Sequence, residues 1–318
     1  MVWLVDIQGR RGLDWLLQEK MIADKKAFCL TIFYISALAA LSLLPIVLVF
    51  LPGGQALAQS SGSYIRQGAR VSGQRSGRVP SQPGGGMIYP EFRHGNQVVR
   101  WIKEQMPLKV YVSRGLSLDG FIDESAGVPV VNVDNVAGWP PLVANLLADP
   151  EALNKLPAAP GYSEAQWQAA IQGINEWKAF EKEGLFSFFL TEEPGEADIH
   201  VFWTNHFVNK LGLALFANDI RGLTSKEIFP VKAVLAGGQA AFKPVVILLR
   251  TSEADGTPMP FAKMKSAAAH EFGHALGIDG HSNNPQDLMS KYYGRGVISP
   301  NDSATIRYLY HVTPDLMP

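Results

Sequence analysis

The most apolar part of the chain lies near its beginning. Residues 27–51 contain no charged side chain, and Lys20, Lys25 and Lys26 precede them. A helix of about 25 residues is roughly 37 Å long, which is enough to cross the hydrocarbon layer of a membrane. The lysines favour a cytoplasmic N-terminus, so the chain beyond the apolar run is expected on the other side of the membrane.

The apolar run is followed by a pattern typical of signal-peptide cleavage. Ala56-Leu57-Ala58 has the small-x-small form of a cleavage site, after which the chain would begin at Gln59. We therefore predict that residues 1–58 are a signal peptide, with an uncleaved signal anchor as the alternative. Because a signal peptide of that length is unusual, we expect translation to begin at Met21.

A polar segment separates the apolar run from the rest of the chain. Residues 59–97 are rich in Ser, Gly, Gln, Pro and Arg, and they lack the apolar density that offsets the entropy of ordering. We interpret this segment as a flexible linker. The globular domain is then predicted to cover residues 98–318.

Within the globular part the hydrophobic pattern changes between the period of strands and that of helices. Alternation or a short apolar run predicts strands at residues 108–112, 186–190, 199–203 and 245–249. Capping residues and one-sided apolar positions predict helices at residues 163–177, 260–276 and 300–310. Residues 114–160 show no clean period, and we interpret them as an insert with short helical pieces at 142–147 and 150–156.

These elements predict the α+β class, with one mixed twisted sheet, helices packed on it and a C-terminal helix. Composition adds two restrictions. The formal net charge of −1 gives no argument for a nucleic-acid partner. The only cysteine, Cys29, lies in the apolar run, so the chain can build neither an intramolecular disulfide nor a cysteine zinc site.

The residues with the clearest chemistry occupy one short segment, His270-Glu-Phe-Gly-His274 followed by His281. Residues four apart lie on the same face of a helix, so the first two imidazoles can bind one zinc ion. Gly277 allows the backbone to leave the helix, which brings His281 back as the third ligand. Three protein ligands leave a fourth position for water, as in catalytic zinc sites. Asp279 is the alternative third ligand.

Glu271 follows the first ligand directly. A carboxylate at this position can take a proton from metal-activated water, so we predict Glu271 as the general base of a hydrolase. Calcium is a further possibility, but the sequence does not support it. Its candidate ligands are scattered loop aspartates of a kind that is usually solvated or turn-forming, namely Asp198, Asp219 and Asp255.

The segment from His270 to Ser282 resembles the metzincin peptidases, and most closely their matrixin branch with its bacterial matrixin-type members. Asp287-Leu-Met289-Ser resembles the Met-turn of that superfamily, which implies that Met289 lies beneath the metal. The resemblance also implies that an extended substrate pairs with an edge strand. The residues implied for that edge strand are Val245, Val246, Ile247, Leu248 and Leu249.

Three features depart from the commonest matrixin pattern. The third histidine follows the second after seven residues instead of six, and the extra residue falls in the loop after Gly277. A propeptide cysteine switch is absent, because Cys29 is the only cysteine. The insert at residues 114–160 is longer than the connection that a minimal matrixin has between its first strand and its first helix.

We therefore predict an exported zinc-dependent endopeptidase that binds one catalytic zinc ion and acts on protein or peptide substrates. The expected location is secreted or periplasmic, with residues 27–51 as a membrane anchor if they are not cleaved. The alternative from another class is a non-catalytic, envelope-attached binding protein that retains a zinc site. No oligomeric state is predicted.

Overall fold

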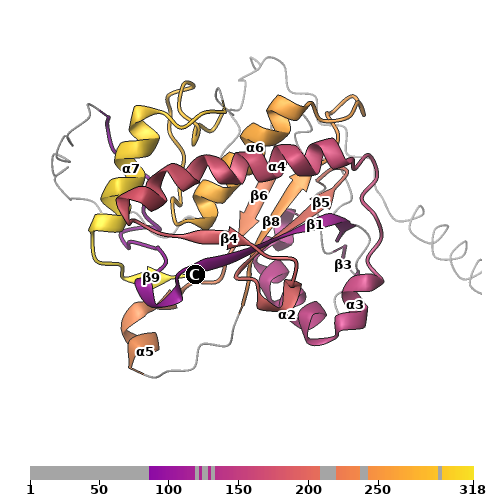
Figure 1. Cartoon of the computed structure of the whole chain (residues 1–318), viewed down its shortest axis with the longest axis horizontal. Helices are drawn as coiled ribbons and strands as arrows, with labels where there is room; N and C mark the ends of the chain where they lie inside the picture. The colour runs from indigo at the N-terminus through magenta and orange to yellow at the C-terminus, as the bar shows by residue number, and fades with distance from the viewer. Residues whose placement is uncertain are drawn as a thin grey trace, which may run out of the picture. The chain divides into compact units, whose positions relative to one another are not determined.

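The described part of the chain is built around one sheet. The computed structural model describes residues 86–118, 122–123, 128–129, 133–207, 220–236, 243–292 and 296–318. Five strands form a mixed sheet in the order β4-β1-β5-β8-β6 (Figure 1). Their bounds are β1 Leu108–Ser117, β4 Phe188–Leu190, β5 Ile199–Thr204, β6 Gly222–Ser225 and β8 Val245–Arg250. Only β6 runs antiparallel to its neighbour, and the predicted α+β fold with one mixed sheet is confirmed.

Three helices accompany the sheet where the sequence predicted them: α4 Glu164–Asn175, α6 Phe261–Ala275 and α7 Pro300–His311. Ser163 and Gln166 form the predicted capping box at the start of α4. Ser299 Oγ accepts the first backbone N–H groups of α7. The other short elements are η1 Lys103–Gln105, β2 Ile122–Asp123, β3 Val128–Pro129, η2 Val133–Gly138, η3 Glu176–Glu183, η4 Pro194–Glu196, β7 Phe229–Pro230, α5 Val231–Leu235 and β9 Leu316–Met317.

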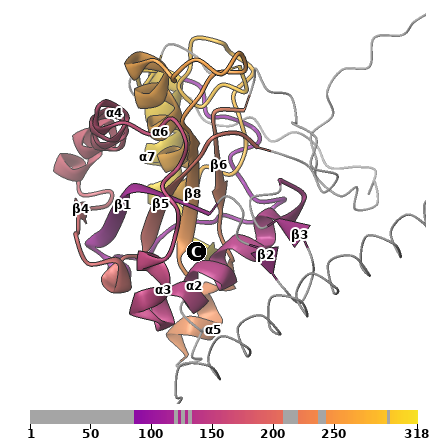
Figure 2. The ribbon, with the colours of Figure 1, turned by 90° about the vertical axis from the view of Figure 1, so that its right-hand side faces the viewer.

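The centre of the sheet is buried on both faces. Every residue of β5 and β8 is buried, and successive side chains enter two different hydrophobic clusters. Val201 and Ile247 point to the face that α4 and α6 cover. Phe202 and Leu248 point to the opposite face, where they meet α2 (Trp139–Ala148) (Figures 1 and 2).

The region interpreted as an insert provides this second cover. It contributes α2 and α3 (Pro150–Asn154), and their buried residues Trp139, Val143 and Leu153 complete the second cluster. The first strand also continues through Ser117, so part of the predicted insert belongs to β1. The insert therefore covers one face of the sheet with an apolar layer and shields it from solvent.

The strand at residues 245–249 is not an edge strand, and the prediction that it forms the edge is wrong. β8 pairs with β5 on one side and with β6 on the other. Among the described strands β6 forms that edge of the sheet. An unbroken apolar run is the pattern of a strand buried on both faces, which fits an interior position. The real edge, Gly222-Leu-Thr-Ser225, is too short and mixed to show a strand period.

The domain begins earlier than predicted. Ile88, Tyr89 and Phe92 are buried in the main core, so residues 86–97 belong to the domain and not to a linker. These few apolar residues are interspersed with Gly, Pro and charged residues, so the average composition of the segment does not indicate a folded domain. The predicted apolar segment at 27–51 and the linker up to residue 85 lie outside the described residues. Within the described ranges, no helix combines the length and apolarity needed to cross a membrane.

The crossing of α4 over α6 depends on a glycine. A Cβ atom added at Gly173 would lie 2.2 Å from the carbonyl oxygen of Lys265 and 2.9 Å from the backbone nitrogen of Ala269. We expect Gly173→Ala to lower the free energy of unfolding by about 2–3 kcal/mol, because two helix backbones would have to separate. Chemical denaturation measures this change. Gly195, whose added Cβ would meet nothing within 4 Å, is the matched control, and an equal effect at both sites would contradict the close crossing.

The imidazole of His200 is buried in β5, and its Nε2 lies 2.8 Å from the carbonyl oxygen of Pro194. Burial lowers the pKa of this imidazole to about 4, against a smaller opposing effect of the Pro194 hydrogen bond. The unfolded chain therefore binds the proton more tightly. The neutral ring therefore makes its full contribution to the free energy of unfolding above pH 6.5. About 3 kcal/mol of this contribution is lost as the pH falls towards 4.

His200→Gln keeps a donor for Pro194 but does not titrate. We expect its urea midpoint to fall less between pH 7 and pH 4.5 than that of the unaltered protein. The other histidines are common to both proteins, so the difference between the two curves isolates His200. Parallel curves would show that His200 is not the source of the pH dependence.

Candidate metal centre

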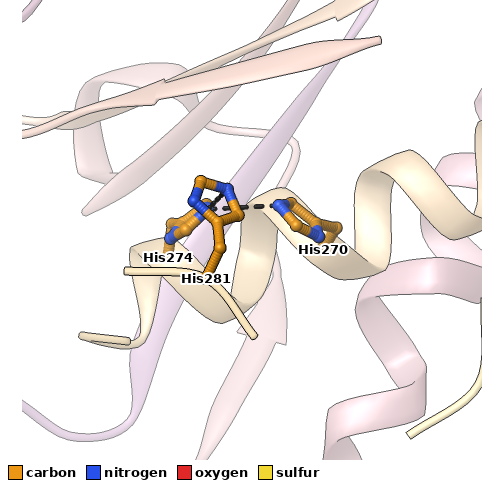
Figure 3. A group of neighbouring side chains, drawn as sticks. All are labelled: His270, His274 and His281. Carbon is orange, nitrogen blue, oxygen red and sulfur yellow. Dashed lines mark hydrogen bonds between the residues drawn. The ribbon is translucent and has the colours of Figure 1, made fainter. Parts of the chain in front are cut away.

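Three histidine rings converge at the C-terminal end of α6. His270 and His274 lie one turn apart on this helix, and His281 lies in the loop that follows it. Figure 3 shows the three rings with their Nε2 atoms turned towards one another. His274 Nε2 is 3.2 Å from Nε2 of His270 and 3.2 Å from Nε2 of His281. Within the described ranges, these side chains form the one group of three or more candidate ligands.

Hydrogen bonds fix which nitrogen of each helical ring faces the shared point. Nδ1 of His270 lies 2.8 Å from the carbonyl oxygen of Leu288, and Nδ1 of His274 lies 2.6 Å from that of Ile278. A carbonyl only accepts, so both Nδ1 atoms carry the proton and both Nε2 atoms of the neutral rings present a lone pair. Two lone pairs at 3.2 Å repel each other unless a cation lies between them.

The two nitrogen spacings that involve His274 Nε2 fit zinc. Two nitrogen ligands at about 2.0–2.1 Å from a tetrahedral zinc ion are roughly 3.3–3.4 Å apart. The observed 3.2 Å agrees with that separation. Burial lowers the pKa of His270 to about 3 and the pKa of His274 well below its ordinary value, and the neighbouring rings add to both effects. The helical rings are therefore held in the neutral form that binds metal.

The loop that carries His281 is shaped by two glycines and by the beginning of the domain. Gly277 has φ +117°, and a Cβ atom there would lie 2.3 Å from the carbonyl oxygen of Val99. A Cβ atom at Gly280 would lie 2.3 Å from the carbonyl oxygen of Glu91. The loop can therefore pack against the residue 91–100 segment only because both positions lack a side chain.

Asp279, the alternative third ligand, is used differently. Its backbone N–H donates to Phe92 O, and its carboxylate lies 3.2 Å from His94 Nδ1 and 3.9 Å from Lys226 Nζ. The carboxylate is not part of the group of ligand atoms that the three histidines form. The structure therefore places Asp279 in the contacts that hold the loop.

Met289 is buried against α6 at Gly273. A Cβ atom at Gly273 would lie 2.4 Å from the Met289 sulfur, so the glycine between the helical histidines makes room for the thioether. The turn around Met289 is held by Asp302 of α7, whose carboxyl accepts from the backbone N–H of Leu288 at 2.8 Å and of Met289 at 3.1 Å. Asp302 is not among the residues predicted from the sequence, although its position three residues after the Ser299 cap is a capping-box signal.

Glu271 is buried between α6 and the edge strand β6. Its carboxylate Oε2 lies 2.8 Å from Thr224 Oγ1, and its backbone oxygen lies 3.0 Å from the same hydroxyl. A Cβ atom added at Gly222 would lie only 2.5 Å from Glu271 Cγ. Neither Thr224 nor Gly222 is among the residues predicted from the sequence, because their proximity to Glu271 arises from the sheet topology.

The aspartates considered for calcium have other partners. Asp198 accepts the backbone N–H of Lys109 at 2.8 Å, and Asp255 accepts the N–H and hydroxyl of Thr257. Asp219 lies outside the described residues. Neither described aspartate belongs to a group of candidate ligands.

The comparisons with known proteins agree with this site. Residues 162–311 match the matrixin family model, a span that begins just before α4 and ends with α7. It includes the three histidines, Glu271 and Met289. No curated protein matches the chain. Matrixins are zinc peptidases, and residues 162–311 of this chain form a matrixin-like metzincin peptidase domain.

Proposed function

We propose that this chain is a zinc-dependent endopeptidase in which His270, His274 and His281 bind one zinc ion and Glu271 is the general base. The observation that carries the proposal is the convergence of three Nε2 atoms on one point, with two of the rings fixed through Nδ1. Met289 is proposed as the apolar floor of the site, since it packs against the helix between the two helical ligands.

The chemistry divides between the metal and the protein. A zinc ion at such a site supplies a Lewis acid that polarises the scissile carbonyl and lowers the pKa of water. Glu271 accepts a proton from the attacking water and delivers it to the leaving amine. Its position on α6 next to His270 keeps the carboxylate on the same helix as two ligands, so the base and the ligands move together.

We place the substrate along β6 and not along β8. The hydrogen bond from Arg250 N to Arg221 O directs the backbone of residues 221, 223 and 225 towards β8. The N–H and carbonyl of Thr224 then point outward from the sheet. An extended peptide can pair with this edge by strand addition, which aligns its backbone beside Glu271.

Digestion of a peptide mixture from denatured proteins tests the proposal. We expect the purified full chain to make internal cleavages that stop when a chelator removes zinc and return when zinc is restored. Cleavage by a protein shown to be free of metal would contradict a zinc mechanism. A protein that holds one zinc ion but cuts nothing would favour the non-catalytic binding protein.

Export is a separate proposal that rests on the sequence of residues 20–58. The lysines, the apolar run and Ala56-Leu-Ala58 together support translocation of everything that follows. Cell fractionation with N-terminal sequencing tests this, and we expect an extracytoplasmic protein that begins at Gln59. An intact N-terminus in the membrane fraction would indicate the anchor, and a cytoplasmic protein would contradict export.

A further inference from the structure

We propose that the side of β6 that faces α6 positions the Glu271 carboxylate, with Thr224 as the main positioning residue. This inference rests on the proposed role of Glu271 as general base, and it adds residues that lie outside the histidine motif. The main contact comes from Thr224, which lies 47 positions before Glu271 in the chain.

Thr224 offers Glu271 a short and rigid hydrogen bond. Thr224 Oγ1 lies 2.8 Å from Glu271 Oε2, a normal distance for a hydroxyl that donates to a carboxylate. Because threonine is branched at Cβ and sits in a strand, few rotamers are open to it. The hydroxyl therefore holds carboxylate oxygen Oε2 of Glu271 in place. This contact restricts the direction in which the second oxygen, Oε1, can point.

Gly222 provides the space that this arrangement needs. It lies two residues before Thr224, on the same face of the strand. An added Cβ atom would lie 2.5 Å from Glu271 Cγ and 3.0 Å from both Cδ and Oε1. Any side chain at this position would push the carboxylate away from β6.

Lys226 follows Thr224 by two residues and connects the end of β6 to α6. Its Nζ donates to the carbonyl oxygen of His274 at 2.9 Å, at the end of α6 that carries the ligands. Alternate positions 222, 224 and 226 thus contact α6 from Glu271 to His274. This periodicity is that of one strand face, so the contacts depend on the register of β6.

A positioning role differs from a stabilising role in its kinetic effect. A general base acts only when it is within hydrogen-bond reach of the proton, and a displacement of about 1 Å can cost about 100-fold in rate. Loss of the Thr224 hydroxyl should therefore lower kcat and leave KM nearly unchanged. Damage to β6 as a docking strand should instead raise KM.

The test compares Thr224→Val with Thr224→Ser and uses Thr257→Val as the matched control. Valine has the shape of threonine without its hydroxyl, while serine keeps the hydroxyl. We expect Thr224→Val to lower kcat by about 10- to 100-fold at nearly constant KM and with one zinc ion bound, and Thr224→Ser to restore most of the rate. Thr257 Oγ1 also donates to a carboxylate, that of Asp255, but it lies in the turn before α6 and outside β6, so its valine variant should stay within about twofold of the unaltered rate.

Gly222→Ala is an independent second variant. It adds one methyl group against Glu271 and removes no hydrogen bond of Thr224, and we expect it also to lower kcat while zinc stays bound. Unchanged kcat for both Thr224→Val and Gly222→Ala in an enzyme that Glu271→Gln inactivates would overturn the inference and leave the proposed function intact.

A double-mutant cycle on thermal unfolding gives a readout that does not depend on activity. We expect Thr224→Val to lower Tm by about 2–5 °C alone and by clearly less in a Glu271→Ala background, because the hydroxyl has then lost the carboxylate and keeps only the backbone oxygen of residue 271 as an acceptor. Equal shifts in both backgrounds would overturn the contact itself. Absence of peptide cleavage by the unaltered protein would contradict the proposed function, while the cycle would still test the Thr224–Glu271 contact.

Discussion

Replacing Glu271 with glutamine is expected to lower kcat by about 10²- to 10⁴-fold while the protein keeps one zinc ion. Glutamine has nearly the same shape as glutamate, and its side-chain oxygen can still accept the hydrogen bond from Thr224 Oγ1. It cannot take a proton from water. The loss should therefore fall on the chemical step, with metal binding and folding preserved.

Cleavage rates of a defined peptide and metal analysis of the same preparation measure both parts of this result. Glu181→Gln is the matched control, because Glu181 also accepts a structural hydrogen bond, from the backbone N–H of Phe188, but lies in η3. It should keep full activity. If Glu271→Gln lost its zinc, or stayed as active as the control, Glu271 would not be the general base.

Replacing Asp302 with alanine is expected to have the largest structural effect. The carboxyl of Asp302 is fully buried and accepts from the backbone N–H groups of Leu288, Met289 and Ser299 and from the hydroxyl of Tyr89. Alanine leaves these buried donors without an acceptor, which we expect to lower the free energy of unfolding by about 4 kcal/mol.

The same change should weaken zinc binding. Leu288 holds His270 Nδ1 through its carbonyl oxygen, so a looser turn leaves the first ligand less well oriented. We expect zinc affinity to fall about 10- to 100-fold, as measured by competition with a chromophoric chelator. Tyr89→Phe removes only one of the donors and should cost about 1 kcal/mol with zinc affinity unchanged. A destabilised Asp302→Ala protein with normal zinc affinity would show that the turn does not orient His270.

The parts of the fold that the sequence predicted are those with local signals. The capping residues Ser163 and Ser299 and the one-sided helices behind them are properties of a few neighbouring residues, and the structure has α4 and α7 there. The position of residues 245–249 within the sheet depends on which strands pair, and that depends on distant segments. Their unbroken apolar run already indicated an interior strand, whereas the family resemblance led to an edge.

The site shows the same division between local and distant information. The meeting of the three rings follows from the four-residue spacing on α6 and the turn at Gly277, all within one short segment. The neighbours of that segment come from distant parts of the chain, among them residues 91–100, β6 and α7. No pattern within residues 270–290 contains these partners. The catalytic role of Glu271 and the position of Met289 beneath a metal stay predictions until zinc and activity are measured.

The dependence of the metal loop on both ends of the domain has a consequence for biosynthesis. A ribosome makes the three histidines before it makes α7, and Asp302 of α7 is what holds the turn that orients His270. The nascent chain therefore contains every proposed zinc ligand while the turn that orients His270 is still incomplete. Such an order of assembly delays completion of the three-histidine site until α7 has been made and has packed against the turn.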